Sequence, residues 1–200
     1  MTLDRRVFIT LAVASGLGSL MPAAGFAADP SISAIQRYGD RLIAAMKGSA
    51  NMSVSARYNR LAPIMASAFD FGTMTKLIAG PSWKSISGGD QAALRQAFTR
   101  FISVYYASRI KGYSGEKFEV DPTPVGKGGQ KIVKTKIISA SGTRQNNYLM
   151  SGSRVIDIYY NGTVSEVAAR RSEFAPILAK GGAPALIAAL QTKSAALLAG

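Results

Sequence analysis

Hydrophobic positions recur about every 3.6 residues through the first half of the chain, which is the spacing of helices with one buried face. In the first such segment the apolar face consists of Ile32, Ile35, Leu42, Ile43 and Met46. Asp90 is well placed to act as the N-cap of the longest helix, because its carboxylate can accept backbone N–H groups. The pattern predicts helices over four ranges, 31–47, 53–68, 70–79 and 91–111.

After residue 112 the period changes to two, and short runs rich in Val, Ile, Tyr and Thr alternate with turn residues. Connections this short join antiparallel neighbours. Helices followed by a meander of about four strands and by further helices predict an α+β fold. The strand-like runs cover 117–121, 131–139, 144–151 and 154–160, with a loop at 122–129, and the last helices are expected at about 170–180, with Ser172 as N-cap, and at 185–198.

The first 27 residues have the features of a cleaved export signal. The pair Arg5-Arg6 precedes a long uncharged apolar stretch, and Gly25 and Ala27 occupy the −3 and −1 positions of a cleavage site. The arginine pair matches a twin-arginine signal, with the general secretory route as the alternative. An uncleaved membrane anchor is disfavoured because glycines and a proline interrupt the end of the stretch. We therefore expect a signal peptide at 1–27, export to the periplasm and a single mature domain at 28–200.

The composition excludes several classes of enzyme. The chain has no cysteine and no histidine, so thiol, serine–histidine and zinc–histidine chemistry are not available to it. Asp and Glu number only 11 against 24 Lys and Arg, and the only acidic cluster is Glu116, Glu119 and Asp121 in an expected turn and strand. We therefore expect no catalytic residues, no metal site and no cofactor.

The strong positive charge suggests an anionic partner. The signal contains Asp4 and Arg5-Arg6, so its removal lowers the net charge only from +13 to +12. Export argues against nucleic acid and leaves phosphate-rich membrane lipids or an acidic protein. The basic run Lys131, Lys134 and Lys136 is either a solvated strand surface or a docking face for anionic head groups.

The strongest motif is Arg154-Val-Ile-Asp157-Ile-Tyr-Tyr-Asn-Gly162-Thr-Val-Ser165, followed by Arg170-Arg171-Ser-Glu-Phe174. Earlier pieces, in order, are Phe69-Asp70-Phe71, Met74, Gly80, Trp83 and an aromatic helix with Phe98, Phe101 and Tyr105. This ordered set resembles the MlaC family, the periplasmic phospholipid carriers of the Mla pathway that are also called toluene-tolerance proteins, and their hopanoid-associated relatives. The resemblance extends from about Ile35 to Leu197. One departure is Ser153, where many relatives carry tryptophan.

The resemblance implies a strongly curved antiparallel sheet that encloses, with the helices, an apolar cavity for lipid tails. It also implies a role that is not enzymatic. The family carries phospholipid or a hopanoid-type lipid between an outer-membrane lipoprotein complex and an inner-membrane ABC transporter with its ring of substrate-binding subunits, in support of outer-membrane lipid asymmetry. The alternatives are a periplasmic adaptor of a transporter that carries no lipid and a small enzyme on a similar sheet.

Candidate lipid-binding residues are the alternating apolar positions of the predicted strands and the helix faces opposite them. Periodicity establishes the alternation but does not say which face of each strand meets the cavity. Ala97, one turn before Phe101 on the long helix, is expected at the cavity wall. The candidates are Phe101, Tyr105, Val133, Ile137, Tyr148, Met150, Val155, Ile158, Tyr160 and Leu186.

Overall fold

The computed structural model describes residues 29–199, so the predicted signal peptide and its cleavage site lie outside the described residues. The fold is α+β, as predicted. The helices are α1 (Pro30–Met46), α2 (Val54–Ala68), α3 (Phe71–Ala79), the 3₁₀ helix η1 (Gly80–Ser85), α4 (Gly88–Arg109) and α5 (Glu166–Ala199). The strands are β1 (Lys117–Val120), β2 (Val125–Lys127), β3 (Gln130–Ser139), β4 (Gly142–Ser151), β5 (Arg154–Tyr160) and β6 (Val164–Ser165).

Polar side chains cap the starts of the helices. Ser53 and Asp70 each accept a backbone N–H group in the first turn of α2 and α3. The long helix α4 begins earlier than predicted, because its N-cap is Ser87 and Asp90 lies three residues further on. The Asp90 N–H group donates to the Ser87 hydroxyl, which donates in turn to the Asp90 carboxylate. The prediction of Asp90 as N-cap is therefore wrong.

The strands form one antiparallel sheet in the order β1-β3-β4-β5-β6, and β2 pairs with the beginning of β3. The sheet has six strands instead of about four, because the short β2 and β6 add to the four long runs. β2 lies in the segment 122–129 that was expected to be loop. Gly128 and Gly129, with φ of 52° and 78°, form the tight turn that folds β2 back onto β3.

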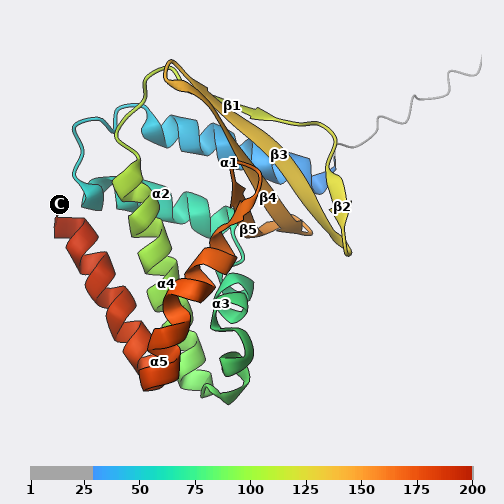
Figure 1. Ribbon diagram of the computed structural model, residues 1–200. Helices are drawn as coiled ribbons and strands as arrows, with labels where there is room; N and C mark the ends of the chain where they lie inside the picture. The colour runs from blue at the N-terminus through green and yellow to red at the C-terminus, as the bar shows by residue number, and fades with distance from the viewer. Residues whose placement is uncertain (1–28, 200) are drawn as a thin grey trace, which may run out of the picture.

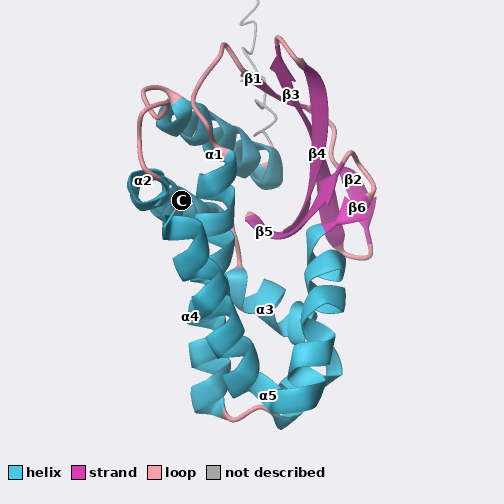
Figure 2. Cartoon of the chain, turned by 60° about the vertical axis from the view of Figure 1, so that its left-hand side comes forward, coloured by secondary structure: helices cyan, strands magenta, loops and turns pink. Residues whose placement is uncertain are grey.

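The helices cover the inner side of the curved sheet and extend beyond it. α1 contacts β1 and β3, whereas α3 and α5 contact β5. Figure 2 shows the sheet at one side of the molecule with α1, α2 and α4 facing its concave surface. Figure 1 shows that α3, α5 and much of α4 lie past the end of the sheet. The hydrophobic core therefore has a part between helices and sheet and a part between the helices alone.

Arg154, the first residue of β5, attaches this strand to α2. Its guanidinium donates hydrogen bonds to the main-chain oxygens of Ala66, Ser67 and Phe69 at the C-terminal end of α2. Carbonyl groups at the end of a helix lack partners within the helix, and a cation there also interacts favourably with the helix dipole. The arginine of the strongest sequence motif is therefore a cap for α2.

Asp157, in the middle of β5, attaches the strand to α5. Asp157 is 5% exposed as a residue, and its carboxylate accepts the N–H groups of Ile158 and Val167 and the hydroxyl of Ser165. α5 begins at Glu166, so the prediction of a start at about residue 170, with Ser172 as N-cap, is wrong. Pro176 then lies inside α5.

α5 contains both helices that were predicted for this part of the chain. They are joined across a kink at Gly182, whose φ of 63° favours glycine, and Figure 1 shows them as a V beside α4. By length and composition, α5 is the one helix among residues 29–199 that could cross a membrane. The kink divides that length, and Phe174, Leu186 and Leu190 from its two halves lie in the core. One face of each half of α5 therefore packs in the core.

Replacing Asp157 with alanine is expected to lower the free energy of unfolding by about 3 kcal/mol, because the groups that donate to its carboxylate lose their acceptor. Chemical denaturation followed by circular dichroism measures this change. Asp40→Ala is the matched control, since Asp40 is exposed on α1 and binds the side-chain amide of Gln36. The control should change stability by less than about 0.5 kcal/mol. Equal losses in the two variants would contradict the role assigned to Asp157.

Candidate functional site

A cavity of about 450 Å³ lies between α1, the C-terminal end of α4 and the concave face of the sheet. Its size is within the usual range of small-molecule sites. Its helical lining residues are Tyr38, Leu42, Ile43, Met46, Leu61, Tyr106 and Arg109, and the C-cap of α4, Ile110, also lines it. The loop before β1 contributes Lys111, Gly112, Ser114 and Glu116, and the strands with their turns contribute Phe118, Ile137, Ser139, Ser141, Arg144, Asn146, Tyr148, Ile158 and Tyr160.

The strand register explains why these sheet residues share one face. Successive side chains of a strand point to opposite faces, and directly paired residues point to the same face. The pairs Ile137↔Arg144, Asn146↔Tyr160 and Tyr148↔Ile158 therefore present six side chains to the cavity. Along β4 the lining changes from the exposed Arg144 to the buried Tyr148. The cavity thus has a solvent-facing end and an inner end.

Aromatic rings separate the inner end of the cavity from the core. Tyr38 of α1 lies edge-on to Phe69, Phe118 and Tyr148, with ring centroids 5.4, 6.3 and 5.8 Å apart. Phe118 approaches α1 closely because Gly39 has no side chain, since a Cβ there would lie 2.1 Å from the Phe118 ring. These interlocked rings set the distance between α1 and the sheet.

Two tyrosine hydroxyls meet at the cavity lining. Tyr106 of α4 and Tyr160 of β5 share a hydrogen bond through their hydroxyl groups. Burial raises the pKa of Tyr160 well above its ordinary value, and the carboxylate of Glu166 nearby raises it further. Burial also raises the pKa of Tyr38 and of Tyr148. The inner end of the cavity is therefore lined by neutral phenols and aliphatic side chains.

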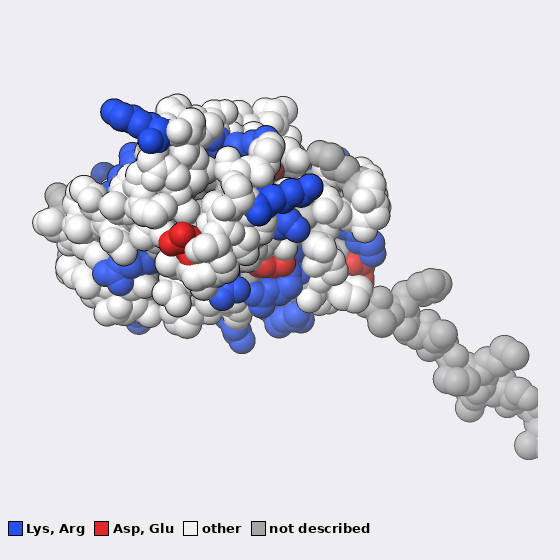
Figure 3. All heavy atoms as spheres, turned by 90° about the horizontal axis from the view of Figure 1, so that it is seen from below, with Lys and Arg blue, Asp and Glu red and all other residues white. Residues whose placement is uncertain are grey.

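The solvent-facing end of the cavity is basic. Arg109, Lys111 and Arg144 are exposed at this end, where the polar side chains of Ser114 and Glu116 also contribute to the lining. The Glu116 carboxylate accepts the N–H group of Ser114 at 2.6 Å. Figure 3 shows that Lys and Arg also outnumber Asp and Glu on another face of the molecule, where they are spread over several parts of the surface. The cavity mouth differs from that surface, because its basic side chains lie next to an apolar interior.

The strand residues among the ten predicted candidates all lie on the concave face of the sheet. Four of them, Ile137, Tyr148, Ile158 and Tyr160, line the cavity. The others, Val133, Met150 and Val155, are outside its lining and are buried in the core.

The helix residues among the candidates lie elsewhere. Phe101 and Leu186 are buried in the core, and Tyr105 packs beside Phe101. Ala97 is also in the core and outside the cavity lining, so its expected place at the cavity wall is wrong. The reason is that this stretch of α4 packs against α5, while only the last residues of α4 reach the cavity.

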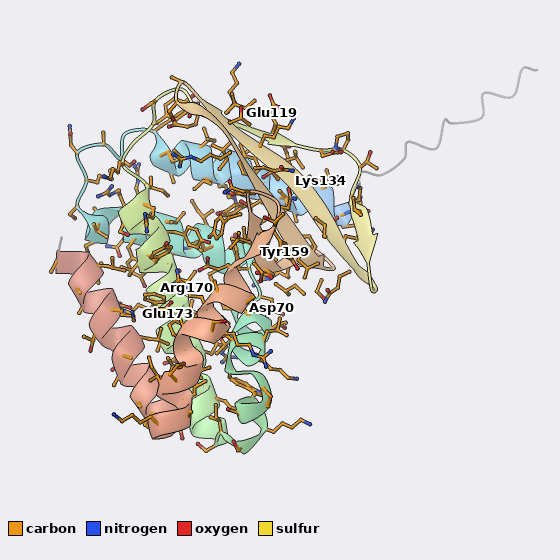
Figure 4. All side chains as sticks on the ribbon, viewed as in Figure 1. Asp70, Glu119, Lys134, Tyr159, Arg170 and Glu173 are labelled. Carbon is orange, nitrogen blue, oxygen red and sulfur yellow. The ribbon has the colours of Figure 1, made fainter. Side chains whose placement is uncertain are left out.

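The rings of Phe101 and Tyr105 pack against a charged network at the start of α5. The Arg170 guanidinium lies over both rings, at 5.3 and 4.6 Å from their centroids. Arg170 also forms salt bridges with Glu166 and Glu173 at 2.7 Å each. Arg170 and Glu173 are labelled in Figure 4. Arg170, the first arginine of the second sequence motif, therefore packs between α4 and α5.

The basic run on β3 does not form one face. Lys131 pairs with Asp29, and alternation places it on the opposite side of the strand from Lys134 and Lys136. Glu119 of β1, labelled with Lys134 in Figure 4, is in register with Lys136. The surface around Lys134 and Lys136 therefore carries both signs of charge. Within residues 29–199 no group of three or more acidic side chains is arranged to hold a metal ion.

The sequence reasoning missed the contribution of α1 and the end of α4 to the cavity. Leu42 and Met46 belong to the apolar stripe that predicted α1, but a stripe that borders a cavity has the same spacing as one that packs in a core. Gly39 was the available signal, because a glycine within a helix often permits close approach of another element.

Comparisons with known proteins give matches of two kinds. The family model described as MlaC protein matches residues 36–192. Among solved structures, the chain is similar to a phospholipid-binding protein from Ralstonia solanacearum in complex with a phospholipid, with a TM-score of 0.74 and 17% sequence identity. This match covers 84% of the chain and 98% of the Ralstonia chain, and at such identity it establishes a common fold. The search of curated proteins found no match.

The buried tyrosines should make stability fall at high pH. Because the folded state raises the pKa of Tyr38, Tyr148 and Tyr160, the unfolded chain loses these protons first as the pH rises through about 10. For each tyrosine that stays protonated in the folded state and is deprotonated in the unfolded state, the free energy of unfolding then falls by about 1.4 kcal/mol per pH unit. Urea denaturation at several alkaline pH values should give a shallower pH dependence for Tyr160→Phe than for the wild type. A Tyr160→Phe slope identical to that of the wild type would refute this assignment.

Proposed function

The chain belongs to the MlaC family, and on this basis we propose that it is a periplasmic lipid carrier, the soluble component of an ABC transport system. Its cargo is a phospholipid or a related membrane lipid such as a hopanoid. The partners are an inner-membrane transporter with its ring of substrate-binding subunits and an outer-membrane lipoprotein complex. The observation that carries the proposal is the cavity, which joins an apolar interior to a basic mouth.

The two ends of the cavity suit the two ends of a phospholipid. Leu42, Leu61 and Ile158 offer apolar surface to an acyl chain at the inner end. Arg109, Lys111 and Arg144 offer charge-assisted hydrogen bonds to a phosphate at the mouth. The solved relative from Ralstonia solanacearum, which has the same fold, was crystallised with a phospholipid. These observations support lipid binding by residues 28–200, with the lining residues of the cavity as the binding site.

Enclosure of the chain is what makes transport across water possible. Each CH₂ group exposed to water costs about 0.8 kcal/mol, so a sixteen-carbon chain costs on the order of 12 kcal/mol. A soluble carrier lowers this cost by surrounding the chain, and it needs neither a nucleophile nor a metal. An adaptor that carries no lipid, the alternative function, has no need of an internal cavity, so the cavity favours the carrier.

Narrowing the cavity is the direct experiment. Ile137→Trp places an indole ring among the lining residues, where open space can accept it. We therefore expect uptake of a fluorescent phospholipid to fall at least about fivefold, while the free energy of unfolding changes by less than about 1 kcal/mol. Fluorescence titration and chemical denaturation of the same preparation provide the two readings.

Ala97→Trp is the matched control, because Ala97 is buried away from the cavity. Overpacking there should cost about 1–3 kcal/mol of stability and leave lipid uptake of the folded protein unchanged. Lipid uptake that is retained by Ile137→Trp and lost by Ala97→Trp would place the lipid elsewhere and overturn the proposed site.

Charge at the mouth should govern the affinity for anionic head groups. Lys111→Gln combined with Arg144→Gln should weaken binding of phosphatidylglycerol about tenfold, with a smaller effect at high salt, because exposed charges are screened. The control combines Lys134→Gln with Lys136→Gln, which removes the same charge from the opposite face of the sheet. Equal weakening in both double variants would show that only net charge matters.

A further inference from the structure

A second recess, of about 220 Å³, lies between α1, the end of α2 and the turn before β5. Three arginines contribute to its lining, Arg37 and Arg41 from successive turns of α1 and Arg154 from β5. Ser67 and Tyr38 also take part. We name this recess the arginine cleft, and it is separate from the basic mouth of the lipid cavity.

The positive charge of the arginine cleft is not neutralised by acidic side chains in its lining. None of its lining residues is Asp or Glu. Of the carboxylates nearest in sequence, Asp40 binds the Gln36 side chain, and Asp70 caps α3 while the charge of Arg154 contributes to lowering its pKa. Within the part of the chain that the structure describes, none of the three arginines forms a salt bridge.

The arginine cleft is partly preorganised. Arg154 is held by its three hydrogen bonds to the end of α2, so its position does not have to be fixed when a ligand binds. Arg41 donates to the Ser67 hydroxyl at 3.4 Å. Arg37 and Arg41 are exposed and lie one turn apart on the same face of α1. A bound anion can therefore be contacted from two sides of the recess.

We propose that the arginine cleft is a docking site for the carboxylate side chains of an acidic protein segment. Guanidinium groups bind carboxylates in a planar, bidentate geometry, which suits a recess that admits single side chains. A membrane surface would fit less well, because membrane-binding surfaces add exposed apolar side chains to their basic residues. The exposed large hydrophobic residues of the described chain are Leu77, Tyr113, Val125 and Val164, and none of them lines the cleft.

The location of the arginine cleft is suited to a partner that exchanges cargo with the protein. Tyr38 lines both the cleft and the lipid cavity, so the two sites share one buried ring as a wall. Phe69 links them as well, because its carbonyl binds Arg154 and its ring packs on Tyr38 at 5.4 Å. A protein docked at the cleft therefore stands one side chain away from the inner end of the cavity. This point rests on the proposed function, whereas the docking site itself does not.

Calorimetric titration of the purified protein with a hexaglutamate peptide tests the proposal. Arg37→Gln combined with Arg41→Gln should weaken binding at least about tenfold at low salt, because the peptide loses charge-assisted hydrogen bonds. Arg154 is left intact because it also caps α2. The matched control is Arg95→Gln with Arg100→Gln, which removes the same charge from exposed positions of α4 outside the cleft, and its affinity should stay within about twofold of the wild type.

Three results would overturn the docking site. The first is equal weakening of hexaglutamate binding in the two double variants, and the second is no binding of hexaglutamate by the wild type. The third is a cleft variant that loses binding to phosphatidylglycerol vesicles while its affinity for the peptide is unchanged. The third result would assign the cleft to a membrane surface. Uptake of fluorescent phospholipid by the cleft variant separates this proposal from the proposed function, because uptake should be retained whichever way the peptide experiment ends.

Discussion

The attachment of the helices to strand β5 is the constraint on which the rest of the molecule depends. Arg154 binds the carbonyl end of α2, and Asp157 binds the first turn of α5, so one strand positions a helix at each side. These are charge-assisted hydrogen bonds to backbone groups that a helix cannot satisfy by itself. With α2 and α5 placed in this way, α4 packs between them, and only its last residues reach the cavity beside the sheet. The concave face beyond that point is left for α1 to cover.

The cavity exists because α1 covers that face without filling it. The rings of Tyr38, Phe118 and Tyr148 hold α1 away from the sheet, and Gly39 admits the Phe118 ring where any larger residue would collide with it. In a close-packed core, other side chains would ordinarily fill the space beside these rings. Here the aliphatic residues next to the rings border open space instead, and the cations at the rim keep that space accessible to a ligand with a charged head. The same few residues therefore determine both the size of the site and its polarity.

The elements of the fold could be predicted because their signals are local. Helix periodicity and the alternation of the strands are each contained in a few neighbouring residues. The errors concern partners that are distant in sequence or competing caps. Ser87 rather than Asp90 starts α4, and Asp157 moves the start of α5 back to Glu166. The same distinction applies to the site. Alternation grouped strand positions without saying which face meets the cavity. Val133 and Ile137 have the same pattern, and only the tertiary position of α1 decides that one is core and the other borders the cavity.

Native mass spectrometry of the protein purified from its own host without detergent tests the central claim most directly. A carrier whose cavity holds one acyl-chain lipid should carry an added mass equal to a single lipid per chain, and extraction with organic solvent should remove that mass and release the lipid for identification. A chain that shows only the mass of the polypeptide, from the native host and from a heterologous host alike, would contradict the account and leave the cavity without the cargo proposed for it.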